Sequence, residues 1–166
     1  MAIPGIDQPE TIQVDESIRL RKFDGIYEFA LEWYQDEELV YLVDGDRTPY
    51  SQERLKRMYE YLDAHGELYF IEALENDTYR PIGDVTFWKE DMPIVIGDGA
   101  YRGKKIGQKV IASLVKRGRE LGYDCLYVSE IYDYNIASRT CFDHVGFCAY
   151  EKTEKGKRYR FELKNE

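Results

Sequence analysis

Apolar and polar residues recur along this chain with two periods, which separate predicted helices from predicted strands. Apolar positions spaced three and four apart predict helices over residues 24–35, 51–64, 106–121 and 137–144, with a turn or short helix at 37–43. Alternating or short continuous apolar runs predict strands at 17–22, 68–74, 82–88, 93–97, 126–131, 147–152 and 159–163. Residues 1–15 show neither period, so we expect a flexible arm there.

The segment from Ile94 to Gly118 is the most informative part of the chain. A short apolar run ends at a glycine-bearing turn, and a helical pattern follows it directly. Residues 102–119 hold seven basic side chains and no acidic one, although the whole chain has a net charge of -9. The first turn of a helix has unpaired N–H groups and a partial positive charge, and glycine lets a ligand approach the backbone. The pattern therefore predicts a site for a phosphate-bearing ligand.

Two common phosphate-binding motifs do not fit this segment. A P-loop needs glycine where this chain has Asp98, and a hydroxyl residue where it has Lys105. A dinucleotide fingerprint beginning at Gly97 would need its last glycine where Arg102 stands. Both motifs are therefore excluded.

The segment resembles motif A of the GCN5-related N-acetyltransferase (GNAT) superfamily, Gln/Arg-x-x-Gly-x-Gly/Ala, in which backbone amides hold the pyrophosphate of acetyl-CoA. Arg102 and Gly107 match the two ends of the motif, while Lys105 replaces its central glycine. A second segment, NIASRTCFDHVGF, places Asn135 and Phe142 at the spacings of the superfamily. The same residues also suit ordinary roles, with Asn135 as a helix cap and a basic first turn exposed to solvent.

This resemblance, which in the cofactor half is to bacterial ribosomal-protein alanine N-acetyltransferases, implies that acetyl-CoA is the co-substrate. It implies an acetyl-CoA site formed by Val95, Ile96, Gly97, Arg102, Gly103, Lys104, Lys105, Ile106, Gly107, Asn135 and Phe142. In the superfamily the fourth predicted strand offers its backbone edge to the pantetheine arm, and a bulge is expected at Gly97.

The resemblance also implies the fold class and the domain organisation. We expect an α+β GNAT fold, with a central mixed, mostly antiparallel sheet of about seven strands that splays between strands 4 and 5 and is flanked by helices. One domain is expected over residues 1–166. Within it, 1–15 is the arm, 16–75 the acceptor-side half, and 81–150 the acetyl-CoA-binding half.

Glu130 is the first candidate for the catalytic base. It stands five residues before Asn135, which is the spacing of a catalytic glutamate in the enzymes that this segment resembles. A strand-end carboxylate paired with a lysine or arginine is the open alternative, and Asp84 and Asp98 are weaker candidates for the base. Phe142 stands where the family usually has a tyrosine that protonates the leaving thiolate. We therefore expect catalysis without that acid.

The acceptor is predicted from an acidic segment beside aromatic residues. Residues 36–46 carry five carboxylates, and Trp33 and Tyr34 precede them; Asp84 lies in a strand that could line the acceptor cleft. Acids beside aromatic rings suit a small cationic amine, such as a polyamine or an aminoglycoside. A solvated acidic surface, a protein or peptide N-terminal amine as acceptor, and a non-catalytic CoA-binding regulatory module all stay open.

Composition and residue counts limit the possible cellular location, metal content and partners. The chain has 166 residues, 43% hydrophobic and 33% charged, without an apolar run that approaches the ~20 residues of a membrane span. Three cysteines lack C-x-x-C spacing, and two histidines are too few for a typical zinc cluster. The acidic net charge argues against nonspecific nucleic-acid binding. We therefore expect a cytoplasmic enzyme with reduced thiols, no metal, no membrane and no nucleic-acid partner. A homodimer stays open.

Overall fold

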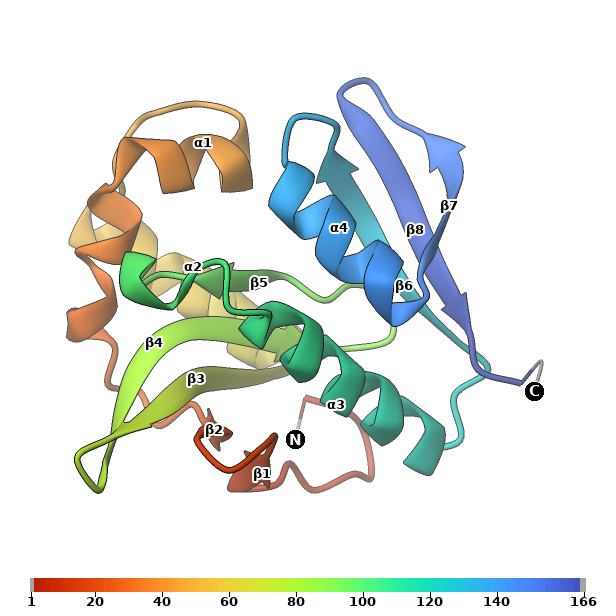
Figure 1. Ribbon diagram of the computed structural model, residues 1–166, viewed down its shortest axis with the longest axis horizontal. Helices are drawn as coiled ribbons and strands as arrows, with labels where there is room; N and C mark the ends of the chain where they lie inside the picture. The colour runs from red at the N-terminus through yellow and green to blue at the C-terminus, as the bar shows by residue number, and fades with distance from the viewer. Residues whose placement is uncertain (1, 165–166) are drawn as a thin grey trace. The chain divides into compact units, whose positions relative to one another are not determined.

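The structure is a computed structural model, which describes residues 2–164 (Figure 1). Contacts group the chain into two compact units, called here the first and the second unit. The first comprises Met1–Thr86 and Ile94–Arg102, and the second Phe87–Pro93 and Gly103–Glu166. Each unit is described by itself below. The expected halves, 16–75 and 81–150, have different boundaries from these units, and a single domain stays a prediction.

The first unit is built on a five-stranded sheet. Its strands are β1 (Thr11–Gln13), β2 (Ile18–Lys22), β3 (Glu67–Glu75), β4 (Thr78–Phe87) and β5 (Ile94–Ile96), in the order β1-β2-β3-β4-β5. A two-residue turn joins β3 to β4, and both of its residues, Asn76 and Asp77, have positive φ, as tight hairpins require. In β4–β5, Asp84 pairs with Val95 in antiparallel register. β5 is therefore an edge strand of this sheet.

Two α-helices and two 3-10 turns complete this part of the first unit: η1 (Glu28–Ala30), η2 (Trp33–Gln35), α1 (Glu37–Asp44) and α2 (Gln52–His65). Ser51 caps α2, with its side chain accepting the backbone N–H of Arg54. In Figure 1, α2 lies against one face of the sheet. The core between them joins aromatic and aliphatic side chains of the helices and the sheet: Ala30, Trp33, Tyr34, Leu39, Val40, Tyr50, Leu55, Tyr59, Leu68, Phe70 and Val95.

The helix predicted over 24–35 was wrong, because this segment forms η1 and η2 instead. Gly25 has a φ of 87°, which breaks the chain away from helical geometry at the expected start. Ile26, which the helical period placed in the core, is 59% exposed. The adjacent residues Trp33 and Tyr34 are both buried, which does not follow the helical spacing of the core positions.

The arm expected over residues 1–15 also contains a strand, β1. Thr11 to Gln13 pair antiparallel with β2, and the N–H of Lys22 donates to the carbonyl of Glu10. A run of three residues is too short to show a period of two, so the pattern predicted no strand there. The partner strand supplies the hydrogen bonds that fix it.

The second unit contains a three-stranded sheet and two helices: α3 (Ile106–Glu120), β6 (Cys125–Tyr132), α4 (Ile136–Val145), β7 (Cys148–Lys152) and β8 (Gly156–Glu162). The strand order is β6-β8-β7, and both pairs are antiparallel. In Figure 1, α4 lies over one face of this sheet. Gly118 lets α3 approach β6 closely, because a Cβ there would lie 3.0 Å from the Leu126 side chain.

The two sheets share no strand among residues 2–164, and the break in pairing falls between β5 and β6. These are the fourth and fifth of the predicted strands, between which the splay was expected. The α+β fold class is confirmed. None of the helices in the described part of the chain has the length and apolar character that a membrane span requires.

Candidate functional site

The N-terminus of α3 differs from those of the other α-helices in the described part of the chain. Side chains of Asp36, Ser51 and Asn135 accept backbone N–H groups at the starts of α1, α2 and α4, whereas no side chain caps α3. The chain enters α3 through two left-handed residues, Gly103 at φ 74° and Lys105 at φ 63°. The first-turn N–H groups of α3 therefore have no side-chain cap, and such groups bind anions readily.

Lys105 is the residue that replaces the glycine of the resembled motif. Its φ of 63° and ψ of 18° lie in the left-handed region, which glycine adopts without steric cost. Lys105 therefore adopts the conformation that the motif glycine would have, at a cost in backbone strain. Lys104 and Lys105 are both exposed, so their ammonium groups add positive charge to the start of the helix.

Arg102, at the end of the first unit, holds the end of β5. Its Nε donates to the carbonyl of Ile96 at 2.9 Å, and its Nη2 to that of Gly97 at 3.2 Å. Its Nη1 lies 3.9 Å from Asp36 Oδ2, at the start of α1. The guanidinium thus ties the end of the edge strand to a helix N-terminus.

The end of β5 has the hydrogen-bond pattern of a bulge. The N–H groups of Gly97 and Asp98 both donate to the carbonyl of Ile82, at 2.8 and 3.0 Å. Trp33 packs directly against Gly97, where a Cβ would lie 2.2 Å from the indole ring. Only glycine fits at this position, which is where the sequence predicted the bulge.

Asp98 belongs to a surface network that fixes the following turn, η3 (Gly99–Tyr101). Its carboxylate accepts the N–H of Ala100 and pairs with Arg80, which also donates to Glu75. The hydrogen bond from Ala100 and the charge of Arg80 lower the pKa of Asp98. Asp98 is thus a turn-forming residue and a poor candidate for a base.

Asp84 is a buried carboxyl held by two tyrosines. The hydroxyls of Tyr34 and Tyr59 donate to its Oδ2 at 2.7 and 2.8 Å, and only 2% of the residue is exposed. Burial raises the pKa of Asp84 to about 6, although both hydrogen bonds act to lower it. Burial also raises the pKa of Tyr34 and of Tyr59.

The three residues predicted to bind the acceptor, Trp33, Tyr34 and Asp84, therefore lie in the core of the first unit. The structure joins Tyr34 to Asp84 and places Trp33 against the bulge. Acceptor contact at these residues stays a prediction. Sequence reasoning missed Tyr59 as a partner of Asp84, because the two residues lie 25 positions apart in the chain.

Glu130 lies in an irregular part of β6, where the register with β8 shifts between Val128 and Ile131. Its side chain is exposed and accepts a hydrogen bond from the hydroxyl of Thr153. The sequence left open a lysine or arginine as partner, whereas the structure supplies a neutral hydroxyl. No local pattern marks Thr153, which lies 23 residues away in the chain.

The segment that contains Asn135 and Phe142 has both a capping and a packing role. Asn135 Oδ1 accepts the N–H of Ser138 at 3.2 Å, so Asn135 is the N-cap of α4. Phe142 is 1% exposed and meets Phe147 edge to face, with the ring centroids 5.1 Å apart. Gly107, in the first turn of α3, faces α4, where a Cβ would lie 3.2 Å from Cys141 Sγ. Cofactor contact at these positions stays a prediction.

Arginines neutralise much of the acidic segment 36–46. Glu38 pairs with Arg47, and Asp44 accepts hydrogen bonds from Arg54 at 2.9 Å and from Tyr50 at 2.7 Å. Much of the negative charge that suggested a cationic ligand is therefore used within the chain.

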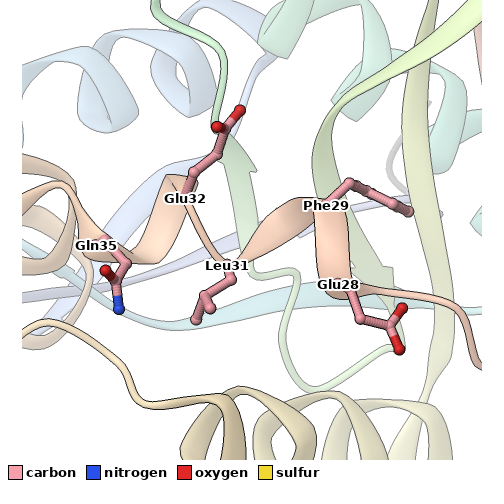
Figure 2. A pocket seen from close by; sticks show the side chains of 5 residues that line it. All are labelled: Glu28, Phe29, Leu31, Glu32 and Gln35. Carbon is pink, nitrogen blue, oxygen red and sulfur yellow. The ribbon is translucent and has the colours of Figure 1, made fainter.

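A surface recess of about 450 Å³ lies beside η1 and η2 in the first unit (Figure 2). It is lined by Glu28, Phe29, Leu31, Glu32 and Gln35. Gln35 donates to the carbonyl of Tyr50 at 2.8 Å, which fixes one side of the recess. Figure 2 shows Glu32 pointing away from Leu31 and Gln35. The lining includes two exposed carboxylates, which point in different directions in Figure 2, and one aromatic ring. The sequence pattern did not single out the recess.

A family model described as "Acetyltransferase (GNAT) family" matches residues 27–147, across both units. The chain belongs to this acetyltransferase family. The predicted enzyme class, an acyl-CoA-dependent acetyltransferase, is thereby confirmed at the level of the family. No curated protein matches the chain.

Solved structures share the fold of this acetyltransferase. A domain from Methanocaldococcus jannaschii DSM 2661 aligns with a TM-score of 0.79 at 23% identity, covering 89% of this chain and 100% of that one. RimL, a ribosomal L7/L12 alpha-N-protein acetyltransferase in complex with coenzyme A, aligns with a TM-score of 0.72 at 14% identity. The alignment covers 93% of this chain and 98% of that one. The aminoglycoside acetyltransferase AAC(6')-Ib, in complex with coenzyme A, aligns with a TM-score of 0.70 at 14% identity. The alignment covers 89% of this chain and 95% of that one. At these identities the likeness concerns the fold.

Proposed function

We propose that this acetyltransferase moves an acetyl group from acetyl-CoA to the primary amine of a small cationic acceptor, by direct attack in a ternary complex. The observation that carries the proposal is the start of α3. It lacks a side-chain cap, follows left-handed residues at Gly103 and Lys105, and lies in the segment that resembles motif A of the family. Two neighbours in fold, AAC(6')-Ib and RimL, were solved with coenzyme A.

Two sets of residues serve acetyl-CoA in this proposal. In the second unit, backbone N–H groups at the start of α3, from Lys105 to Gly107, bind the pyrophosphate. In the first unit, the edge of β5, at Val95 to Gly97, pairs with the pantetheine arm, and its amides polarise the thioester carbonyl. Arg102 keeps that edge in place through the carbonyls of Ile96 and Gly97.

Glu130 is the proposed base. The acceptor nitrogen attacks the thioester carbon, and Glu130 accepts the proton that the nitrogen loses. The carbon–sulfur bond then breaks, and coenzyme A leaves as a thiolate. Glu130 is exposed to solvent, whereas Asp84 is buried beneath two tyrosines, so Glu130 is the more accessible of the two carboxylates. Phe142 has no hydroxyl, and thiolates are modest bases, so the proposal includes no general acid.

The acceptor is proposed to bind in the recess beside η1 and η2. Glu28 and Glu32 provide negative charge and Phe29 an aromatic face, a combination that suits an ammonium group. Trp33, Tyr34 and Asp84 support this segment from the core through their packing and hydrogen bonds. AAC(6')-Ib is described as an aminoglycoside acetyltransferase and RimL as an alpha-N-protein acetyltransferase. An N-terminal amine of a protein or peptide is therefore the second candidate acceptor.

Isothermal titration with acetyl-CoA and with CoA tests the donor site first. We expect micromolar binding that Arg102→Glu weakens at least tenfold, because the charge reversal releases the end of β5. Arg57→Glu, an exposed site on α2, makes the same charge change and should bind like the wild type. Absence of binding by the wild type would contradict the proposal.

An amine panel read by thiol release then tests the reaction. Spermidine, kanamycin and an alanine-initiated peptide separate the two acceptor classes. Glu130→Gln should abolish most turnover while acetyl-CoA still binds. If the wild type binds acetyl-CoA and releases no thiol with any acceptor, the alternative of a regulatory CoA-binding module replaces the enzyme.

A further inference from the structure

Thr153 lies in the turn between β7 and β8 and contacts the carboxylate of Glu130 across the sheet. Its hydroxyl donates to Glu130 Oε2 from the turn that precedes β8. Glu130 itself lies where the β6–β8 register shifts, so the ladder does not pair its backbone in the regular pattern. A side chain in such a position needs another contact to fix its direction, and Thr153 provides one.

Close packing of Gly156 brings the turn to this place. A Cβ on Gly156 would lie 2.0 Å from the carbonyl oxygen of Ile131, the residue after Glu130. Glycine therefore lets β8 approach the backbone of β6 directly beside the base. The N–H of Asp133 also donates to the carbonyl of Lys155 at 2.9 Å, which holds the turn against the end of β6.

The direction of the hydrogen bond to Glu130 is fixed as well. The N–H of Gly156 donates to Thr153 Oγ1 at 2.9 Å, and the N–H of Thr153 donates to the carbonyl of Gly156 at 2.9 Å. Because Thr153 Oγ1 accepts from Gly156, its single proton is directed toward the carboxylate. A hydroxyl that donates to a charged carboxylate forms one of the stronger hydrogen bonds.

We infer that Thr153 is a positioning residue for the base, a role that rests on the proposed function of Glu130. Thr153 holds Oε2, which leaves Oε1 of the same carboxylate as the oxygen that accepts the proton in this scheme. During the reaction the proton moves from the amine nitrogen to Oε1, and Thr153 keeps its own proton. Thr153 touches neither co-substrate in this scheme and acts only through Glu130.

Kinetics of matched variants test this role, with thiol release from acetyl-CoA measured for spermidine, kanamycin, an alanine-initiated peptide and water alone. Thr153→Val keeps the shape of the side chain and removes the donor. It should lower kcat about tenfold and leave KM for acetyl-CoA unchanged, because a misdirected base slows the chemical step alone. Thr153→Ser keeps the hydroxyl and should stay within about twofold of the wild type. Thr153→Ala provides a second donor-free variant should Thr153→Val fold poorly.

A double-mutant cycle separates the inference from the proposed function. Thr153→Val should have no further effect in a Glu130→Gln background, since two residues that act through one step are not additive. If Glu130→Gln turns over like the wild type, Glu130 is not the base and the proposed function fails at that residue. If Glu130→Gln is slow, the inference is overturned when Thr153→Val is as fast as the wild type, when the two effects multiply, or when Thr153→Ser is as slow as Thr153→Val. No thiol release by the wild type with any acceptor would overturn both.

Discussion

The hydroxyl of Tyr59 donates a 2.8 Å hydrogen bond to Oδ2 of Asp84, 25 positions further along the chain. The same oxygen accepts the hydroxyl of Tyr34 at 2.7 Å, so one carboxyl joins η2, α2 and β4. The carboxyl is buried and contacts two neutral donors. Its ionisation is therefore linked to the stability of the first unit.

Asp84→Asn should change how stability depends on pH. The pKa of Asp84 rises from 3.8 to about 6 on folding, so the folded chain holds this proton more tightly. The contribution of Asp84 to stability is therefore full below about pH 4 and is lost as the pH rises through about 6. Relative to that of the wild type, the free energy of unfolding of Asp84→Asn should rise by on the order of 3 kcal/mol between pH 4 and pH 7.

Urea unfolding of both proteins at pH 4.5 and pH 7.5 measures this difference. Asp143→Asn, at an exposed position on α4, is the matched control and should show a much smaller change. An equal difference between Asp84→Asn and the wild type at both pH values would contradict the burial argument.

Gly97→Ala should destabilise the first unit by about 2 kcal/mol or more, because the new methyl group overlaps the Trp33 ring. Gly99→Ala makes the same change two residues later, where the nearest atom would lie at 3.8 Å, and should be nearly neutral. Thermal unfolding of the two variants provides the comparison, with tryptophan fluorescence, to which both Trp33 and Trp88 contribute, as the signal. Equal stability of the two variants would rule out close packing at the bulge.

Lys105→Gly should stabilise the chain by about 0.5–1 kcal/mol, because glycine adopts the left-handed conformation without strain. Lys104→Gly removes the same charge at a residue without positive φ, and should destabilise the chain through added backbone entropy. Chemical denaturation measures the free energy of unfolding of the wild type and of both variants. Titration of both variants with CoA shows in addition whether the ammonium of Lys105 aids pyrophosphate binding, since Lys105→Gly keeps the backbone amide.

Phe142→Tyr should destabilise the second unit by about 1–3 kcal/mol, because the added hydroxyl enters the apolar packing beside Phe147. We expect turnover to stay near that of the wild type. A substantial increase in kcat would instead show that the enzyme lacks a proton donor that the tyrosine supplies. Phe147→Tyr, in the same core, is the control for the packing effect alone.

The features of the α3 segment that favour an anion are local in the sequence. Backbone donors at a helix start, the glycine-bearing turn and the basic residues all lie within a few positions of one another, so sequence spacing is close to spatial arrangement. The capping role of Asn135 was open to prediction for the same reason. The bulge at Gly97 was inferred from family resemblance, and its close contact with Trp33 supplies the physical cause.

Contacts between distant segments could not be predicted in this way. The helical period failed over residues 24–35, since packing buried Trp33 and Tyr34 together and exposed Ile26. The sequence placed Asp84 in a strand that could line the acceptor cleft, and only the structure shows that Tyr34 and Tyr59 donate hydrogen bonds to it.

The sequence by itself determined the family, the order of most elements and the basic, glycine-bearing start of α3, because these depend on local periodicity, capping and turn chemistry. Tertiary structure alone decided that Asp84 is a buried carboxyl and that the hydroxyl of Thr153 donates to Glu130. Burial and side-chain partners depend on which strands and helices pack together, and residues far apart in the chain carry no local signal of that packing.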